Sequence, residues 1–172
     1  LRKLKTFGDW PDVSETGLLA NLDAWLVPWL DNITSLKQLR QIDLVSVFES
    51  WLGWEKRQRL NELLPETYLT PAGTQRKINY DFTEQPGLSV PLQEMLGVAD
   101  SPAIAAGDLP RVSHLLSPAG RPLQVTGDLA AFWQGAYQEV KKEMRGRYPK
   151  HYWPDDPTSA QATRFTKRHL KK

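Results

Sequence analysis

The sequence predicts an α+β fold: an N-terminal helical segment, a small mostly antiparallel sheet, then a long amphipathic helix and a Pro/aromatic tail. Three observations predict this order. Apolar residues recur every three or four positions before residue 65. Short alternating runs separated by Pro and Gly follow in the middle of the chain. One continuous apolar stripe then begins at Leu129.

The N-terminal third is expected to be helical. Leucines and tryptophans of residues 18–30 fall on one apolar face. Asp43 is suited to cap the start of a helix over residues 44–52, and Gly53 is suited to end it. A third helix is expected over residues 55–64, where Pro65 follows.

The middle of the chain is expected to form the sheet. Ile78, Tyr80 and Phe82 alternate with polar residues, which is typical of a half-buried strand. Two Pro-Ala-Gly sequences, at residues 71–73 and 118–120, are each expected to form a turn between two strands. Pro91 is placed to begin a short helix. The expected strands are residues 68–70, 75–82, 88–90, 111–116 and 122–126.

One helix is predicted over residues 129–145, with a polar face opposite its apolar stripe. Because composition changes at Pro65 and again after Pro157, we predict three parts. Residues 1–65 form a helical segment, residues 66–157 form the main domain, and residues 158–172 form a flexible basic tail.

Charge is concentrated near the C-terminus. The net charge is +2, but residues 138–172 carry ten Lys/Arg against four Asp/Glu, a net of +6. A local positive region can attract a polyanion even on a nearly neutral protein. The absence of cysteine excludes disulfides and thiolate metal sites and fits a cytoplasmic location. No apolar run is long enough for a membrane span, and the chain is expected to derive from a longer protein.

The sequence contains no motif for catalysis or cofactor binding. It lacks the phosphate-binding loop Gly-x-x-x-x-Gly-Lys-Ser/Thr, the dinucleotide fingerprint and the zinc-protease motif. Its three histidines have no metal-ligand spacing. We therefore expect no catalytic residue, no metal and no cofactor in this chain.

Basic and aromatic residues are concentrated over residues 141–153. Basic side chains can bind nucleic-acid phosphates, and aromatic rings can stack on bases. The rings can equally anchor the proline-rich tail on the protein's own core. The predicted RNA-binding residues are Lys141, Lys142, Arg145, Arg147, Lys150 and His151, and the stacking or structural aromatics are Tyr148, Tyr152 and Trp153.

Three segments carry a resemblance to a known family: residues 88–97 (LSVPLQEMLG), 115–126 (LLSPAGRPLQVT) and 128–157, which include RGRYPKHYWPDDP. Together they resemble the C-terminal region of the HrpB-type bacterial ATP-dependent RNA helicases of the DEAH/RHA class. The resemblance is strongest from residue 60 to residue 157 and weaker over residues 14–59.

The resemblance implies a non-catalytic accessory domain that supports RNA binding and unwinding by helicase motor domains. ATP and Mg²⁺ would bind those motor domains, which are absent from this chain. The implied partners are single-stranded RNA or another nucleic acid, and the helicase core itself. The alternative is a docking module that packs on the core or recruits a protein partner, with Trp10 as the candidate contact.

Overall fold

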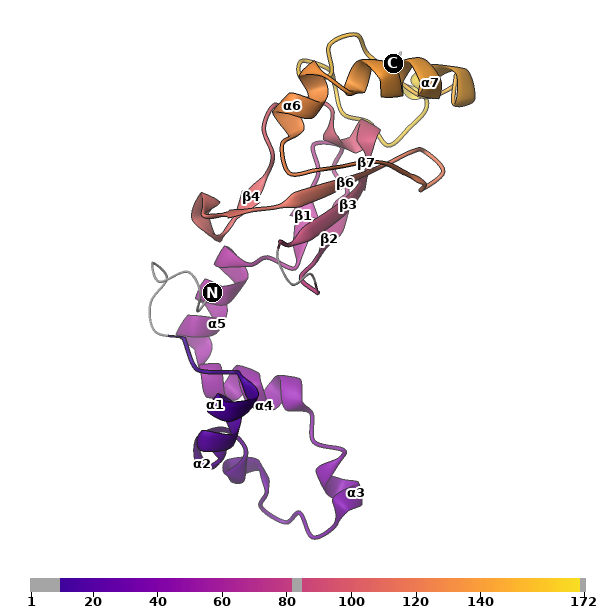
Figure 1. Ribbon diagram of the computed structural model, residues 1–172. Helices are drawn as coiled ribbons and strands as arrows, with labels where there is room; N and C mark the ends of the chain where they lie inside the picture. The colour runs from indigo at the N-terminus through magenta and orange to yellow at the C-terminus, as the bar shows by residue number, and fades with distance from the viewer. Residues whose placement is uncertain (1–9, 82–84, 171–172) are drawn as a thin grey trace. The chain divides into compact units, whose positions relative to one another are not determined.

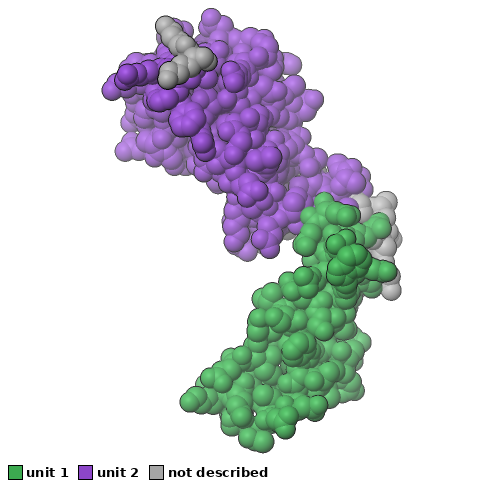
Figure 2. Space-filling view, turned by 180° about the vertical axis from the view of Figure 1, so that it is seen from behind, with its two compact units in different colours: residues 1–62 green, residues 63–172 purple. Residues whose placement is uncertain are grey.

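The computed structural model describes residues 10–81 and 85–170. The chain divides into two compact units, Leu1–Glu62 and Leu63–Lys172, coloured separately in Figure 2. The division falls three residues before the boundary predicted at residue 65. Within the described ranges, no helix combines the length and the apolar character needed to cross a membrane.

Unit 1 is built from short helices. Its apolar residues 18–30 do not form one helix, because the chain breaks at Asn21 and bends again at Pro28. Instead Trp25 stacks on Phe48 at 4.9 Å between ring centroids and, with Val47, forms a small core. The helices are α1 (Glu15–Ala20), α2 (Leu22–Trp25), η2 (Val27–Trp29), α3 (Leu36–Leu39), α4 (Leu44–Leu52) and α5 (Trp54–Leu63).

The predicted boundaries of the α4 helix are confirmed. The Asp43 carboxylate accepts a hydrogen bond from the Val45 N–H at 3.1 Å, which satisfies a donor left free at the helix start. Gly53 follows the last turn with a φ of +76°, a conformation that favours glycine. Helix α5 begins at Trp54, directly after this glycine.

Unit 2 contains a five-stranded sheet with the order β1-β2-β3-β6-β7. The sheet is mostly antiparallel, as predicted, but β3 and β6 pair in parallel. A parallel pair needs a crossover, and residues 92–111 supply it with η3 (Leu92–Met95), β4 (Ala103–Ile104), η4 (Ala105–Gly107) and β5 (Leu109–Pro110). The sheet strands are β1 (Thr67–Leu69), β2 (Gln75–Asn79), β3 (Gly87–Pro91), β6 (Val112–Leu116) and β7 (Pro122–Thr126).

The register of the sheet directs alternate residues into the core. Ile78 lies opposite Leu88, and Leu88 lies opposite Ser113, so one buried row crosses β2, β3 and β6. The alternation predicted for β2 is therefore confirmed at Ile78. Strand β2 ends at Asn79, the Tyr80 ring is partly exposed, and Phe82 lies outside the described residues.

Two helices, α6 (Leu129–Gln134) and α7 (Tyr137–Arg147), lie on the same side of the sheet, in orange in Figure 1. The prediction of one helix over residues 129–145 was wrong, because Gly135 leaves helical geometry with φ −112° and ψ −95°. The break lets the Trp133 and Tyr137 rings meet edge to face at 5.3 Å. The Trp133 indole N–H donates to the Val98 carbonyl oxygen at 2.7 Å.

The segment after Pro157, expected as a flexible tail, lies against unit 2 in the structure (Figure 1). The Gly97 N–H donates to the Pro157 carbonyl oxygen at 2.9 Å, and the Thr163 N–H donates to the Gln93 carbonyl oxygen at 3.0 Å. Thr163 is buried. Lys171 and Lys172 lie outside the described residues. We call residues 157–170 the C-terminal strap.

Candidate nucleic-acid interface

Helix α7 positions most of the predicted basic residues. Its buried face consists of Tyr137 and Met144, which pack into the core, with Val140 partly buried between them. This face fixes the rotation of the helix, so that Lys142 and Arg145 point into solvent. Arg145 and Arg147 occupy the last turn, where positive charge is favourable at the helix C-terminus.

Two of the predicted cations have acidic partners. The Lys141 ammonium lies 3.0 Å from the Asp155 carboxylate, and the Lys141 side chain is only 13% exposed. This contact lowers the pKa of Asp155. Arg147 lies 3.9 Å from the Glu143 carboxylate, one turn earlier on α7. The positive charges of Lys141 and Arg147 are therefore each partly neutralised by a neighbouring carboxylate.

Three other cations are exposed and remain available. In the described ranges, no carboxylate lies within 4.0 Å of the charged ends of Lys142, Arg145 or Lys150. All three residues are exposed. We refer to Lys142, Arg145 and Lys150 as the basic surface. The structure thus separates the five predicted lysines and arginines into exposed cations and cations paired with a carboxylate, which the sequence alone does not distinguish.

His151 differs from the other predicted contacts. Its ring is half-buried and meets the Tyr148 ring edge to face at 6.2 Å between centroids. Burial lowers the pKa of the imidazole, because the charged form loses solvation. At neutral pH, His151 therefore supplies a neutral ring and hydrogen-bonding nitrogens rather than a positive charge.

The three aromatic residues point mainly toward the core. Trp153 is 4% exposed, and its indole N–H donates to the Tyr148 carbonyl oxygen at 3.2 Å. Tyr148 and Tyr152 are partly buried and pack against the core cluster. Trp153 is therefore structural. Only Tyr148 and Tyr152 retain ring surface that an external group could contact.

A buried hydrogen bond holds the Pro/aromatic segment on α7. The Tyr137 hydroxyl donates to the Pro154 carbonyl oxygen at 2.8 Å, and both residues are buried. Burial raises the pKa of the Tyr137 hydroxyl, so it remains a donor across the physiological range. The prolines at 149, 154 and 157 restrict the backbone further, so the path of this segment is largely fixed.

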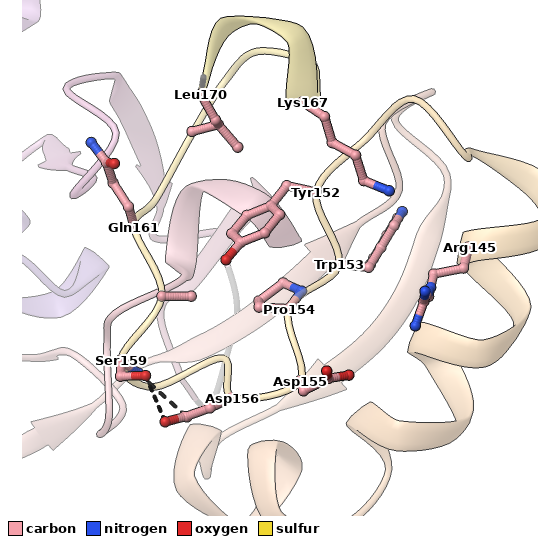
Figure 3. Close-up of a pocket in the computed structure, with 11 residues that line it drawn as sticks. Arg145, Tyr152, Trp153, Pro154, Asp155, Asp156, Ser159, Gln161, Lys167 and Leu170 are labelled. Carbon is pink, nitrogen blue, oxygen red and sulfur yellow. Dashed lines mark hydrogen bonds between the residues drawn. The ribbon is translucent and has the colours of Figure 1, made fainter. Parts of the chain in front are cut away.

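The C-terminal strap and α7 enclose a depression of about 630 Å³, shown in Figure 3. Arg145 and Lys167 supply its positive charges, and Asp155 and Asp156 supply its negative charges. We call it the strap depression. Its lining residues are Arg145, Tyr152, Trp153, Pro154, Asp155, Asp156, Ser159, Ala160, Gln161, Lys167 and Leu170.

Lys167 is a candidate residue that sequence reasoning missed. It is the first residue of η5 (Lys167–His169), and its N–H donates to the Lys150 carbonyl oxygen at 2.9 Å. This backbone contact brings Lys167 back to the end of α7. One sequence signal points to the reversal: Asp156, followed by Pro157, Thr158 and Ser159, is typical of a turn closed by an aspartate side chain.

Asp156 forms that turn in the structure. Its carboxylate accepts hydrogen bonds from the Thr158 N–H at 2.9 Å, the Thr158 hydroxyl at 2.7 Å and the Ser159 hydroxyl at 2.6 Å. The Ser159 and Thr158 hydroxyls, with the Thr158 N–H, lower the pKa of Asp156 to about 2. The charge of Asp156 is therefore used to close the turn.

The described residues contain no group of three His, Asp or Glu side chains arranged to hold a metal ion. The strap depression brings together cations, carboxylates and an aromatic ring, which suits binding of a charged ligand. The Ser159 hydroxyl that lines the depression donates to the Asp156 carboxylate, and this contact belongs to the turn.

Comparisons with known proteins agree on one family. The family model described as "ATP-dependent helicase C-terminal" matches residues 25–157. The ATP-dependent RNA helicase HrpB of Escherichia coli (strain K12) is 48% identical over 161 residues, which is 94% of this chain and 20% of that protein.

Two solved structures have the same fold. A crystal structure of the E. coli DExH-box NTPase HrpB superposes with a TM-score of 0.88 at 48% identity, over 94% of this chain and 20% of that one. A crystal structure of the Escherichia coli DEAH/RHA helicase HrpB gives a TM-score of 0.73 at 45% identity, over 88% and 19% of the two chains. The chain spans about a fifth of the length of these relatives. It belongs to the family of C-terminal domains of HrpB-type ATP-dependent helicases.

Proposed function

We propose that this domain supports RNA binding by an ATP-dependent RNA helicase of the HrpB type, in the bacterial cytoplasm, through its basic surface. The observation that carries the proposal is the separation of charge from aromatic rings at the end of α7. Trp153 faces the core, whereas Lys142, Arg145 and Lys150 face solvent, and among the described residues no carboxylate lies within 4.0 Å of their charged ends. Exposed cations without a close acidic partner are what phosphate contacts require.

The domain does not hydrolyse ATP in this proposal. The 172 residues contain no phosphate-binding loop, so ATP and Mg²⁺ are assigned to motor domains outside these residues. The domain instead holds RNA that the motor moves. Because phosphate contacts carry no sequence information, binding through the basic surface should be insensitive to base sequence.

The test compares two charge reversals of equal size in the 172-residue chain. Lys142→Glu/Lys150→Glu removes two cations of the basic surface, and Lys56→Glu/Arg59→Glu makes the same change on α5, where both residues are exposed. Affinity for a fluorescent single-stranded RNA is measured by anisotropy. Two exposed ion pairs at about 0.5–1 kcal/mol each predict about 5- to 30-fold weaker binding for the first variant.

The control variant should bind within about twofold of the unmodified chain. Equal weakening by the two variants would mean that net charge, rather than the basic surface, governs binding. Unchanged binding in both would contradict the proposal itself.

A second function, docking on the helicase core or on a partner protein, is favoured by the apolar surface of unit 1. Trp54 is 70% exposed, whereas Trp10, the residue expected from the sequence, is partly buried. Exposed tryptophans are frequent at the centre of protein interfaces. Trp54→Ala should weaken capture of the separately produced remainder of an HrpB-type helicase, and capture equal to that of the unmodified chain would exclude this contact.

A further inference from the structure

The strap depression places two cations from separate elements beside the buried Trp153 ring and on the same depression as the partly buried Tyr152 ring. Arg145 comes from the last turn of α7, and Lys167 comes from the first residue of η5. In Figure 3 both side chains approach the edge of the depression next to Trp153. Both residues are exposed, and in the described ranges no carboxylate lies within 4.0 Å of either charged end.

Backbone contacts fix the position of Lys167. The Lys167 N–H binds the Lys150 carbonyl oxygen, and earlier in the strap the Thr163 N–H binds the Gln93 carbonyl oxygen. Gly97 binds the Pro157 carbonyl oxygen where the strap begins. Because these three hydrogen bonds are distributed along the strap, they hold the Lys167 backbone at a fixed distance from the end of α7, where Arg145 lies.

The walls of the depression offer an apolar surface of moderate size. Tyr152, Pro154 and Leu170 line it, and the Tyr152 ring is only partly buried (Figure 3). Its volume of about 630 Å³ falls within the range of small-ligand sites, about 300–1,000 Å³. Convergent cations beside a flat ring are the elements that proteins use to hold single-stranded nucleic acid.

The two carboxylates of the depression are already engaged. Asp156 is held by Thr158 and Ser159, and Asp155 is paired with Lys141. The Asp155 side chain is nevertheless 92% exposed, so its pairing with Lys141 is solvated and weak. Asp155 therefore opposes an anionic ligand by its own charge and by its electrostatic interaction with Arg145.

We infer that the strap depression seats one nucleotide of single-stranded RNA, with a phosphate between Arg145 and Lys167 and a base against the Tyr152 ring. This inference rests on the proposed RNA-binding function and locates one contact within it. It assigns a direct role in binding to the strap, which begins at the last of the matched residues 25–157.

The sign of the Asp155→Asn effect tests the chemistry of the ligand. Removing this carboxylate ends its repulsion of a phosphate and its interaction with Arg145, so RNA should bind about two- to fivefold more tightly. A basic peptide in the same depression would instead bind more weakly, because it would lose an acidic contact.

The experiment uses the 172-residue chain and a 5′-fluorescein-labelled ten-nucleotide uridine RNA, with binding measured by anisotropy. Lys167→Ala should weaken binding about two- to fivefold. Arg168→Ala is the matched control: it removes an exposed neighbouring cation that does not line the depression, and it should have a smaller effect.

Two results would overturn the inference. Lys167→Ala could bind the RNA as well as the unmodified chain does, or Asp155→Asn could weaken RNA binding, which would contradict the expected repulsion between the Asp155 carboxylate and a phosphate. If either result is found while Lys142→Glu/Lys150→Glu still weakens RNA binding, the strap depression is not a binding site, and the proposed function of the basic surface is retained. If none of the three variants changes RNA affinity, both the inference about the strap depression and the proposed RNA-binding function are contradicted.

Discussion

Gly97 is the point where a single methyl group should loosen the first attachment of the strap. Its φ is +81°, and a Cβ added there would lie 3.0 Å from the Ala160 carbonyl oxygen. The Gly97 N–H also donates to the Pro157 carbonyl oxygen at 2.9 Å. Because Ala160 and Pro157 both belong to the strap, Gly97→Ala must push the strap outward at its first attachment.

The expected cost has two parts. An L-residue in left-handed geometry costs about 1–2 kcal/mol. Loss of the hydrogen bond to Pro157 adds about 0.5–1.5 kcal/mol. The total decrease in the free energy of unfolding of unit 2 should therefore be about 1.5–3.5 kcal/mol. Gly120→Ala provides the control, since its φ is +75° and no atom lies within 4 Å of the added Cβ.

Two assays distinguish the cost of the left-handed geometry from the cost of displacing the strap. Urea unfolding should show a loss of about 1–2 kcal/mol for Gly120→Ala and a larger loss for Gly97→Ala. Limited trypsin digestion should cut after Arg164 about two- to tenfold faster in Gly97→Ala only, because cleavage follows opening of the strap. Equal stability losses and equal cleavage rates for the two variants would refute the attachment of the strap at Gly97.

Two further predictions concern charged groups in unit 2. Arg76→Ala removes the ion-pair partner of the buried Glu94 carboxylate and should cost about 3 kcal/mol, while Arg76→Met/Glu94→Met should recover most of that loss in urea unfolding. Asp156 has a folded-state pKa of about 2 against an ordinary 3.8, so its contribution to stability is present above pH 3.8 and is lost as pH falls toward 2. Thermal unfolding at pH 5 and pH 2.5 should show a smaller acid-induced decrease for Asp156→Asn than for the unmodified chain, and an equal decrease would contradict this.

Local sequence signals predicted local structure well. Asp43 and Gly53 mark the ends of α4, because capping depends on residues within a few positions of the helix. Alternation around Ile78 predicted a strand, and its side chain faces the core. Both signals act over short distances along the chain, so one sequence is enough to detect them.

Features set by distant contacts were not predictable in the same way. The apolar stripe of residues 129–144 continues across Gly135, so periodicity alone does not reveal that α6 and α7 are separate helices. The parallel pairing of β3 and β6 depends on the crossover between them, which leaves no local pattern.

The strap is the clearest case within the candidate site. It attaches through backbone groups, such as the Thr163 N–H and the Gln93 carbonyl oxygen, and backbone contacts impose no residue type. A polar, basic composition therefore predicted a flexible tail and left Lys167 out of the candidate site. The separation of Lys142 and Arg145 from the engaged Lys141 likewise depends on where Asp155 lies in space.

The most direct test of RNA binding by the basic surface is the salt dependence of single-stranded RNA affinity, measured for the 172-residue chain between about 50 and 200 mM salt. Three phosphate contacts by Lys142, Arg145 and Lys150 predict a slope of log affinity against log salt of about −2, at about −0.7 per contact. Lys142→Glu/Lys150→Glu should reduce the slope to about −0.7. A slope near zero, or one that the double reversal leaves unchanged, would contradict binding through this surface.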